Sequence, residues 1–203
     1  MRSYSEIETT IKRATKAIGF SWGISEEVGK NIKLLEMFGL PGLKNLNQYF
    51  KIYNISNFEN IGEISSLNTA KGYYCPIICG LNFFDQSPLI LKFNEIEINK
   101  IAFPIIFLSF LSRSSEITGK RIFLKMDNKE FLFNFNESIY SNYLSGDILE
   151  KSDKINIKFL DNKNNFSEDD WLEMHKLSIK TYVEESEESK SRTAGAGLTD
   201  NDW

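Results

Sequence analysis

The sequence predicts an α+β fold in a single domain that spans residues 1–203. Apolar residues recur at helical spacing near the N-terminus, alternate with polar residues in the middle of the chain, and return to helical spacing near the C-terminus. We therefore expect a helical N-terminal part (1–55), a β-rich core (72–160) with an antiparallel or mixed sheet, and a C-terminal helix followed by a Gly/Asp-rich segment (167–203). No strand is followed by a Gly-rich turn and a helix, which argues against a dinucleotide or P-loop site.

The composition is that of a globular protein: 41% of the residues are hydrophobic and 13% are aromatic. The net charge of −4, with no clustered basic face, argues against a nucleic-acid partner. The longest apolar run, 101–111, holds about half of the roughly 20 residues that cross a bilayer. We therefore expect a soluble, cytoplasmic protein with no membrane contact.

Two cysteines and one histidine limit the chemistry that the chain can offer. Cys75 and Cys79 have apolar neighbours, which favours buried thiols over a disulfide scaffold, a redox site or a zinc site with its four ligands. No cofactor or metal is assigned.

The N-terminal part is expected to begin with a helical hairpin. Ser5 to Glu8 has the pattern of a capping box, and Gly19 ends the first helix. The second helix is expected to begin near Ser25, with Glu26 and Glu27 in its first turn, where they complement the helix dipole. A DNA-binding helix-turn-helix is the alternative. It is disfavoured by the long predicted loop and by these two glutamates.

Trp22 has two interpretations. A tryptophan held between two short helices belongs to the core, whereas an exposed tryptophan on the connecting loop is a platform for a ligand. We favour the core but keep Trp22 among the candidate ligand-binding residues. A third helix is expected over 43–55, and its apolar residues are Leu43, Leu46, Tyr49, Phe50 and Tyr53.

The middle of the chain is expected to form the sheet. Residues 54–71 lack a regular pattern, and 73–85 is expected to be a buried strand or a short helix. Strands are expected over 89–98 and 101–111. The clearest signal is a hairpin with its turn at Asp127 and Asn128, formed by the alternating segments 122–126 and 131–135. A further strand is expected over 154–160.

The last predicted helix begins at Ser167, has an acidic first turn and continues to about Glu184. Trp171, His175, Ile179 and Tyr182 share one face of this helix. His175 is the only imidazole in the chain and is therefore a candidate acid or base, although a helix histidine packed against the core is the more ordinary interpretation.

The terminal segment has the residue types of a small-ligand site. Its glycines allow backbone N–H groups to surround an anion, and its arginine suits a carboxylate or phosphate. Its consecutive Asp, Asn and Asp side chains suit a divalent cation or a water. The candidate ligand-binding residues are Ser191, Arg192, Gly195, Gly197, Asp200, Asn201 and Asp202. Asp200 and Asp202 are also candidate catalytic residues, whereas the alternative is a frayed polar terminus.

Two stretches resemble a family of uncharacterised bacterial proteins, the domain of unknown function 3726. One is the Ser-Trp-Gly-Ile-Ser-Glu-Glu-Val-Gly run at 21–29, with Gly-Leu-Pro-Gly at 39–42. The other runs from 182 to 202 and ends in Gly-Ala-Gly-Leu-Thr-Asp-Asn-Asp. The resemblance implies no reaction, cofactor or catalytic residue, and Glu184 departs from it, because a proline is expected there. It implies that the terminal segment is a family signature rather than a random tail.

Two hypotheses on function follow. In the first, the terminal segment forms a site for a small anionic metabolite, near Trp22 and the acidic start of the second helix. In the second, the protein is a non-catalytic accessory subunit whose C-terminal segment docks into a partner enzyme.

Overall fold

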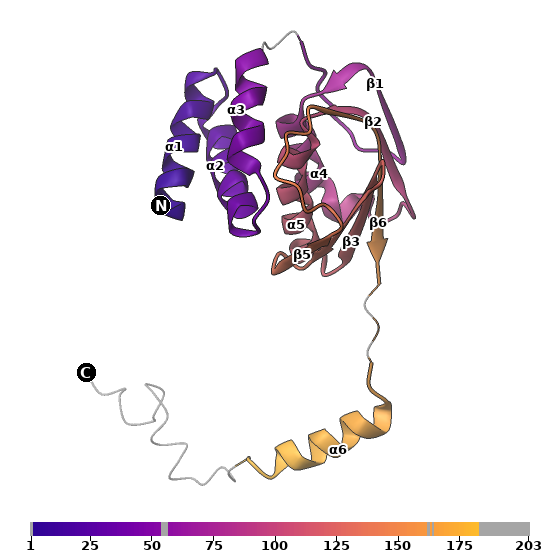
Figure 1. The fold of residues 1–203 in the computed structure, drawn as a ribbon. Coiled ribbons are helices and arrows are strands. Elements are labelled where there is room, and N and C mark those ends of the chain that lie inside the picture. The colour runs from indigo at the N-terminus through magenta and orange to yellow at the C-terminus, as the bar shows by residue number, and fades with distance from the viewer. Residues whose placement is uncertain (1, 54–56, 162, 164, 183–203) are drawn as a thin grey trace, which may run out of the picture. The chain divides into compact units, whose positions relative to one another are not determined.

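The computed structural model describes residues 2–53, 57–161, 163 and 165–182 of the chain. Contacts between Cα atoms divide the chain into two units, 1–162 and 163–203. Within the described residues, the first unit contains five helices and a six-stranded mixed sheet, and the second contains one helix. The α+β fold class is therefore confirmed (Figure 1), and the prediction of one domain over 1–203 stays a prediction.

The N-terminal helices are α1 (Tyr4–Ala17), α2 (Trp22–Met37) and α3 (Gly42–Ile52). The predicted capping box at Ser5 is wrong, because the Oγ of Ser3 accepts the N–H of Glu6 at 3.1 Å and begins the helix two residues earlier. Gly19 ends α1 as predicted, with a φ of +114° that suits glycine.

The second helix begins earlier than predicted. The Oγ of Ser21 accepts the N–H of Ile24 at 3.3 Å, so α2 begins at Trp22 rather than near Ser25. Glu26 and Glu27 consequently lie beyond the first turn, which holds no acidic residue. The connection is only 18–21, so loop length no longer argues against a helix-turn-helix, whereas the two glutamates still do.

Two glycines allow α1 and α3 to approach α2 closely. A Cβ added at Gly29 would lie 2.8 Å from the carbonyl oxygen of Glu8 in α1, and one added at Gly42 would lie 2.7 Å from the Cβ of Leu35. Lys12 and Glu26 add an ion pair of 3.0 Å between α1 and α2. The three helices therefore form a layer in which α2 contacts both of its neighbours.

The sheet has the strand order β1-β2-β6-β3-β4-β5, and only β1 and β2 are parallel to each other. The last strand in sequence, β6, thus lies between β2 and β3 in the middle of the sheet. The strands are β1 (Leu67–Tyr74), β2 (Ile96–Ala102), β3 (Arg121–Met126), β4 (Lys129–Asn134), β5 (Ser138–Ser141) and β6 (Lys151–Leu160).

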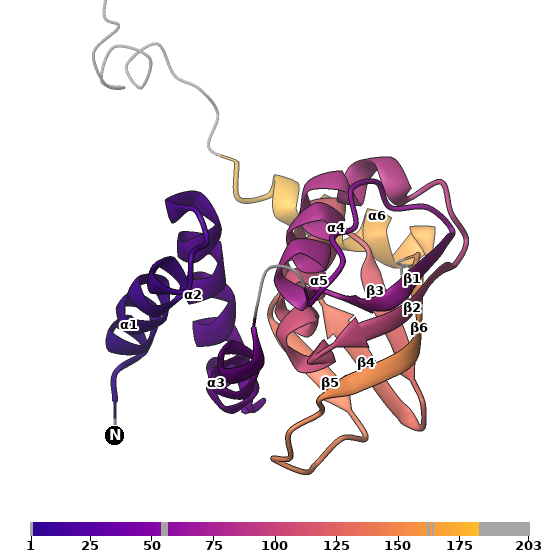
Figure 2. The same cartoon turned by 90° about the horizontal axis from the view of Figure 1, so that it is seen from above.

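Two helices cover one face of the sheet, α4 (Pro76–Ile90) and α5 (Pro104–Thr118). Figures 1 and 2 show them between the sheet and the N-terminal helices. Two predicted strands were therefore wrong. The segment 101–111 is mostly helix, and the predicted strand 89–98 joins the end of α4 to the start of β2. The segment 73–85, expected to be a strand or a short helix, is largely α4.

The helix α5 is buried on all sides, and this explains the error. It buries 11 of its 15 residues, because it lies against α4, the sheet and the N-terminal helices. Its first eight residues, 104–111, are apolar except for Ser109, so this part of the helix has no polar stripe and shows no 3.6-residue period. Gly80 of α4 allows close packing, since a Cβ there would lie 2.6 Å from the Cγ of Phe110.

The predicted hairpin is confirmed. Phe123 pairs with Leu132 and Leu124 with Phe131, while Asp127 adopts a φ of +53° in the turn. The strand predicted over 154–160 is also confirmed and begins three residues earlier. Two strands have weaker signals: β1 begins inside the predicted irregular stretch 54–71, and β5 was not predicted.

The second unit contains α6 (Glu168–Ile179). Ser167 caps it as predicted: its Oγ accepts the N–H of Asp170 at 3.1 Å, and its own N–H donates to the carboxylate of Asp170 at 2.8 Å. Phe166 stacks on Trp171 with a centroid distance of 6.1 Å, which adds a hydrophobic staple. The helix ends at Ile179, short of the predicted Glu184, which lies outside the described residues.

Candidate functional site

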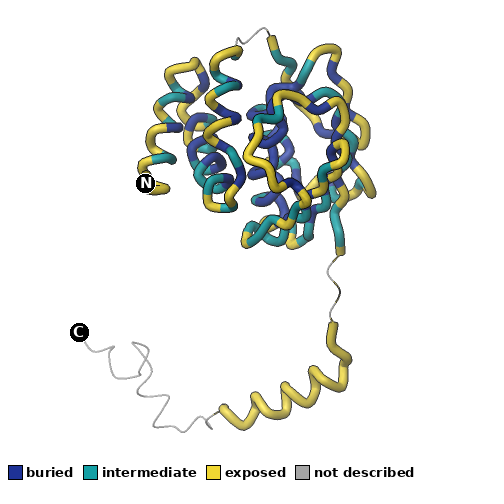
Figure 3. The backbone as a smooth tube through the Cα atoms, viewed as in Figure 1, coloured by how far each residue is buried: buried dark blue, intermediate teal, exposed yellow. Residues whose placement is uncertain are grey.

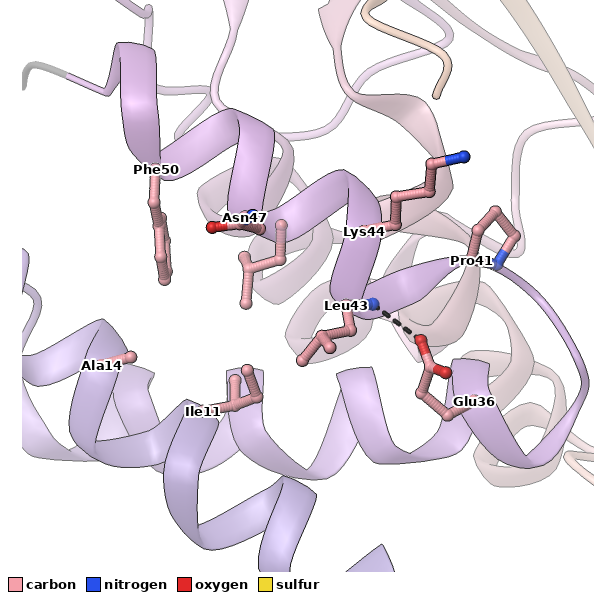
Figure 4. A pocket seen from close by; sticks show the side chains of 9 residues that line it. Ile11, Ala14, Glu36, Pro41, Leu43, Lys44, Asn47 and Phe50 are labelled. Atoms are coloured by element: carbon pink, nitrogen blue, oxygen red, sulfur yellow. Dashed lines mark hydrogen bonds between the residues drawn. The ribbon is translucent and has the colours of Figure 1, made fainter. Parts of the chain in front are cut away.

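An apolar groove lies between α1 and α3, with a volume of about 460 Å³. Ile11 and Ala14 come from α1, and Leu43, Leu46 and Phe50 come from α3. Figure 4 shows Ile11, Ala14, Leu43 and Phe50 facing the space between the two helices. Ile11 and Leu46 are buried, whereas Leu43 is 44% exposed, so apolar surface in this groove faces solvent.

The polar groups at the rim of the groove hold the protein itself together. The carboxylate of Glu36, at the end of α2, accepts the N–H of Leu43 at 2.8 Å. Pro41, the N-cap of α3, makes no side-chain hydrogen bond, so Glu36 supplies the negative oxygen that the start of α3 needs. The ammonium of Lys44 donates to the carbonyl of Gly146 at 2.9 Å. These two charged groups are therefore engaged, and Asn47 is the exposed polar group of the rim.

The groove continues along α1 toward the N-terminus. A second hollow of about 270 Å³ is lined by Arg2, Glu6, Ile7, Thr10 and Leu43. Leu43 lines both hollows and therefore lies where they meet. Together they extend from Arg2, before the start of α1, to Ala14, and α1 covers about 15 Å from Tyr4 to Ala14.

The groove is open because α1 and α3 both pack on α2 and contact each other little. On the side of α1 that faces α3, Thr10 and Ala14 are short and cannot fill the space. Figure 3 shows that exposed residues recur along α1 and α3.

A separate hollow of about 660 Å³ lies away from the groove, between the start of α2 and α4. Glu26, Glu27 and Asp85 line it, but the two glutamates already form ion pairs. The carboxylate of Glu27 lies 2.5 Å from the guanidinium of Arg113, which also lies 4.3 Å from the ring centroid of Phe84. We assign these carboxylates a structural role, because they join α2 to α1 and α5.

At Glu27, ion pairing changes the pKa of the carboxyl group more than burial does. Burial of its carboxyl group raises the pKa, but hydrogen bonds from Arg113 and Lys30 lower it further, so the net pKa lies below the ordinary value. The pKa of Glu26 is lowered by hydrogen bonds from Lys12 and Lys30. Both carboxylates are therefore charged at neutral pH.

The two cysteines lie in the core, as the sequence predicts. Burial raises the pKa of the Cys75 and Cys79 thiols, so both are protonated at neutral pH and are poor nucleophiles. The Sγ of Cys75 lies 3.0 Å from the hydroxyl of Tyr49, and burial also raises the pKa of that hydroxyl. This pair fixes α3 against the start of α4.

Only two of the predicted site residues lie in the described part of the chain. Trp22 is 57% exposed at the start of α2, so the preferred interpretation of it as a core residue is wrong. The ammonium of Lys16 lies 5.7 Å from the centroid of its ring, a cation–π contact. Trp22 is not among the residues that line the described hollows, although its neighbours Ser21 and Gly23 line the one beside α4.

His175 is exposed on α6 with its ring centroid 6.5 Å from that of Trp171. It is therefore not packed against a core within the described part of its unit. The other candidates lie outside the described residues: Ser191, Arg192, Gly195, Gly197, Asp200, Asn201 and Asp202. Within the described residues, no group of three or more His, Cys, Asp or Glu side chains is arranged to hold a metal ion.

Sequence reasoning missed the groove because it named the apolar residues of the third helix without dividing them between a core face and an open face. Leu46 and Tyr49 are buried, whereas Leu43 and Phe50 face the groove. Leu43 and Phe50 are seven residues apart, two helical turns, and this spacing was the available signal.

Residues 2–75 match the model of a family described as protein of unknown function (DUF3726). The resemblance predicted from the sequence is thus confirmed over this stretch, which includes α1, α2, α3 and the groove. The second resembling stretch, 182–202, lies outside the match, and a bacterial origin stays a prediction. Neither a curated protein nor a solved structure matches the chain.

None of the helices in the described ranges is both long enough and apolar enough to cross a membrane. The expected cytoplasmic location stays a prediction.

Proposed function

We propose that this protein is a non-catalytic, protein-binding subunit that holds an apolar helix of a partner in the groove between α1 and α3. The observation that carries the proposal is the lining of the groove. Ile11, Leu43, Leu46 and Phe50 all line the groove between two helices, and Leu43 exposes apolar surface there to solvent. Grooves of this kind bind amphipathic helices, whose apolar side chains recur every three or four residues.

The chemistry of the groove favours a peptide over a small polar metabolite. In a metabolite site, a few polar groups of the protein are free to bind the ligand. In this groove, the side chains of Glu36 and Lys44 already bind backbone groups of the chain itself. The elongated shape, about 15 Å along α1, suits about 10 residues of helix.

The proposal is tested by titrating the ¹⁵N-labelled full chain with a panel of amphipathic helical peptides. We expect amide shifts at Leu43, Asn47 and Phe50, and loss of binding in Leu43→Asp. Leu89→Asp is the matched control, because Leu89 is an exposed leucine of α4 that does not line the groove. If no peptide binds, or if Leu43→Asp binds as well as the wild type, the proposal is refuted.

A second candidate function is a site for a small anionic metabolite on the terminal segment. It is supported by the residue types of that segment, in which Arg192 would hold the anion and Asp200 and Asp202 a cation or a water. The test is a thermal-shift screen of the full chain and of a chain ending at Ser189, with divalent cations and anionic metabolites. A ligand that stabilises only the full chain would support this function. Equal responses of the two chains would argue against it.

A further inference from the structure

We propose that the helix held in the groove is α6 of a second copy of this chain. The inference rests on the proposed function and names the partner. Each copy carries one apolar groove and one helix with an exposed apolar face. Two copies can therefore exchange their helices around a two-fold axis, so that both grooves are filled and the assembly closes as a dimer.

The helix α6 has the surface of a docking helix. None of its residues is buried within the described part of its unit. Trp171, His175 and Ile179 follow one another at intervals of four residues and share one face of α6, with Leu172 beside them. Trp171 and Ile179 are 53% and 49% exposed. A soluble protein rarely leaves so continuous an apolar face without a partner.

Contacts within its own first turn stabilise α6 as a helix. The reciprocal hydrogen bonds of Ser167 and Asp170, together with the stack of Phe166 on Trp171, satisfy and fix its first turn. A docking helix that is formed beforehand loses less conformational entropy when it binds.

The lengths of α6 and the groove agree. The helix has 12 residues and therefore covers about 18 Å, close to the roughly 15 Å that α1 covers from Tyr4 to Ala14 along the groove. Trp171 and Ile179 are eight residues apart, or about 12 Å, so both can enter the groove at once.

The charges are complementary. Lys44 and Lys51 are the charged residues of α3, which has no acidic side chain. Among the acidic residues in the first six positions of α6, Glu168 and Asp169 lie beside its apolar face, whereas Asp170 and Glu173 lie opposite it. With the apolar face in the groove, Glu168 and Asp169 can lie near the basic side of α3. Such rim charges select the partner and its orientation, and salt weakens their contribution.

The first test is the mass of the full chain in solution. We expect sedimentation to show a dimer that dissociates on dilution and more readily at high salt. Ile179→Asp should weaken the dimer at least about tenfold. Leu177→Asp is the matched control, because Leu177 is equally exposed, at 52%, but lies on the other side of α6. A monomer at all concentrations, or equal effects of the two variants, overturns the proposal.

The second test identifies the contact by disulfide trapping. Chains with Asn47→Cys are mixed with chains carrying His175→Cys and oxidised, while the native thiols are buried. We expect a disulfide between the two chains, and little from Glu173→Cys, which lies away from the apolar face. No disulfide in the mixture, or one formed only within a chain carrying both substitutions, overturns the second copy as the partner.

The two proposals fail in distinguishable ways. A monomer whose groove still binds amphipathic peptides in the NMR titration overturns the dimer and leaves the proposed function supported. A chain that is monomeric and binds no peptide overturns both.

Discussion

The packing of α4 on α5 leads to a sharp prediction for Gly80→Ala. In an exposed helix, alanine stabilises relative to glycine by about 1 kcal/mol, because it reduces the entropy of the unfolded chain. At Gly80 the new Cβ would lie 2.6 Å from the Cγ and 2.7 Å from the Cε2 of Phe110. That ring is completely buried, so it cannot swing into solvent.

The steric cost outweighs the gain in helix propensity. Relief of the overlap requires Phe110 to shift by about 1 Å within a close-packed core, and overpacking of this kind costs roughly 1–3 kcal/mol. After the propensity gain is subtracted, we expect Gly80→Ala to lower the free energy of unfolding by up to about 2 kcal/mol. Urea denaturation followed by circular dichroism measures this quantity.

A control within α2 separates the two contributions. A Cβ added at Gly23 would meet no atom within 4 Å, so Gly23→Ala should keep the favourable propensity and gain a few tenths of a kcal/mol. If Gly80→Ala is as stable as the wild type or more stable, α4 and α5 are not packed as closely as described, and the reasoning is refuted.

Three further predictions follow from the same contacts. Replacing Glu36 with Ala should lower the free energy of unfolding by about 1 kcal/mol in urea, because the start of α3 loses its only described side-chain acceptor, and an unchanged value would contradict that role. Because the pKa of Glu27 is lower in the folded protein, this group stabilises the fold fully above its unfolded pKa, and the stabilisation is lost as the pH falls through the folded pKa. Acidification from pH 5 to about pH 2 should therefore lower the free energy of unfolding more in the wild type than in Arg113→Gln. Parallel curves of stability against pH would contradict this. Cys75 and Cys79 should react with a thiol reagent at neutral pH only as fast as the protein unfolds, and rapid labelling in native buffer would exclude their burial.

The sequence predicts correctly the elements that have one buried face and one exposed face. The hairpin of 122–126 and 131–135 alternates because successive residues of β3 and β4 are in turn buried and at least partly exposed. The prediction failed for α5, which is buried on all sides and has no period to detect. Pro104, at its first helical position, was the remaining signal, because proline is favoured there.

The candidate groove could not be predicted from the sequence, for a different reason. A groove depends on what two helices leave between them, and the sequence of α3 records only that Leu43 and Phe50 are apolar. Their partners across the groove, Ile11 and Ala14, are about 30 residues away in the chain, so no local pattern connects them. The terminal candidates from Ser191 to Asp202 lie outside the described residues, and their roles stay predictions.

The position of β6 has a consequence for the synthesis of this protein on the ribosome. Until residues 151–160 have emerged, β2 and β3 have no strand between them, and the nascent chain holds two partial sheets, each with an unpaired edge beside the gap. Exposed edges of this kind invite pairing with other chains. A message truncated shortly before residue 151 would therefore yield a product prone to aggregation, whereas one truncated after residue 161 would yield a chain in which every strand of the sheet has its partner.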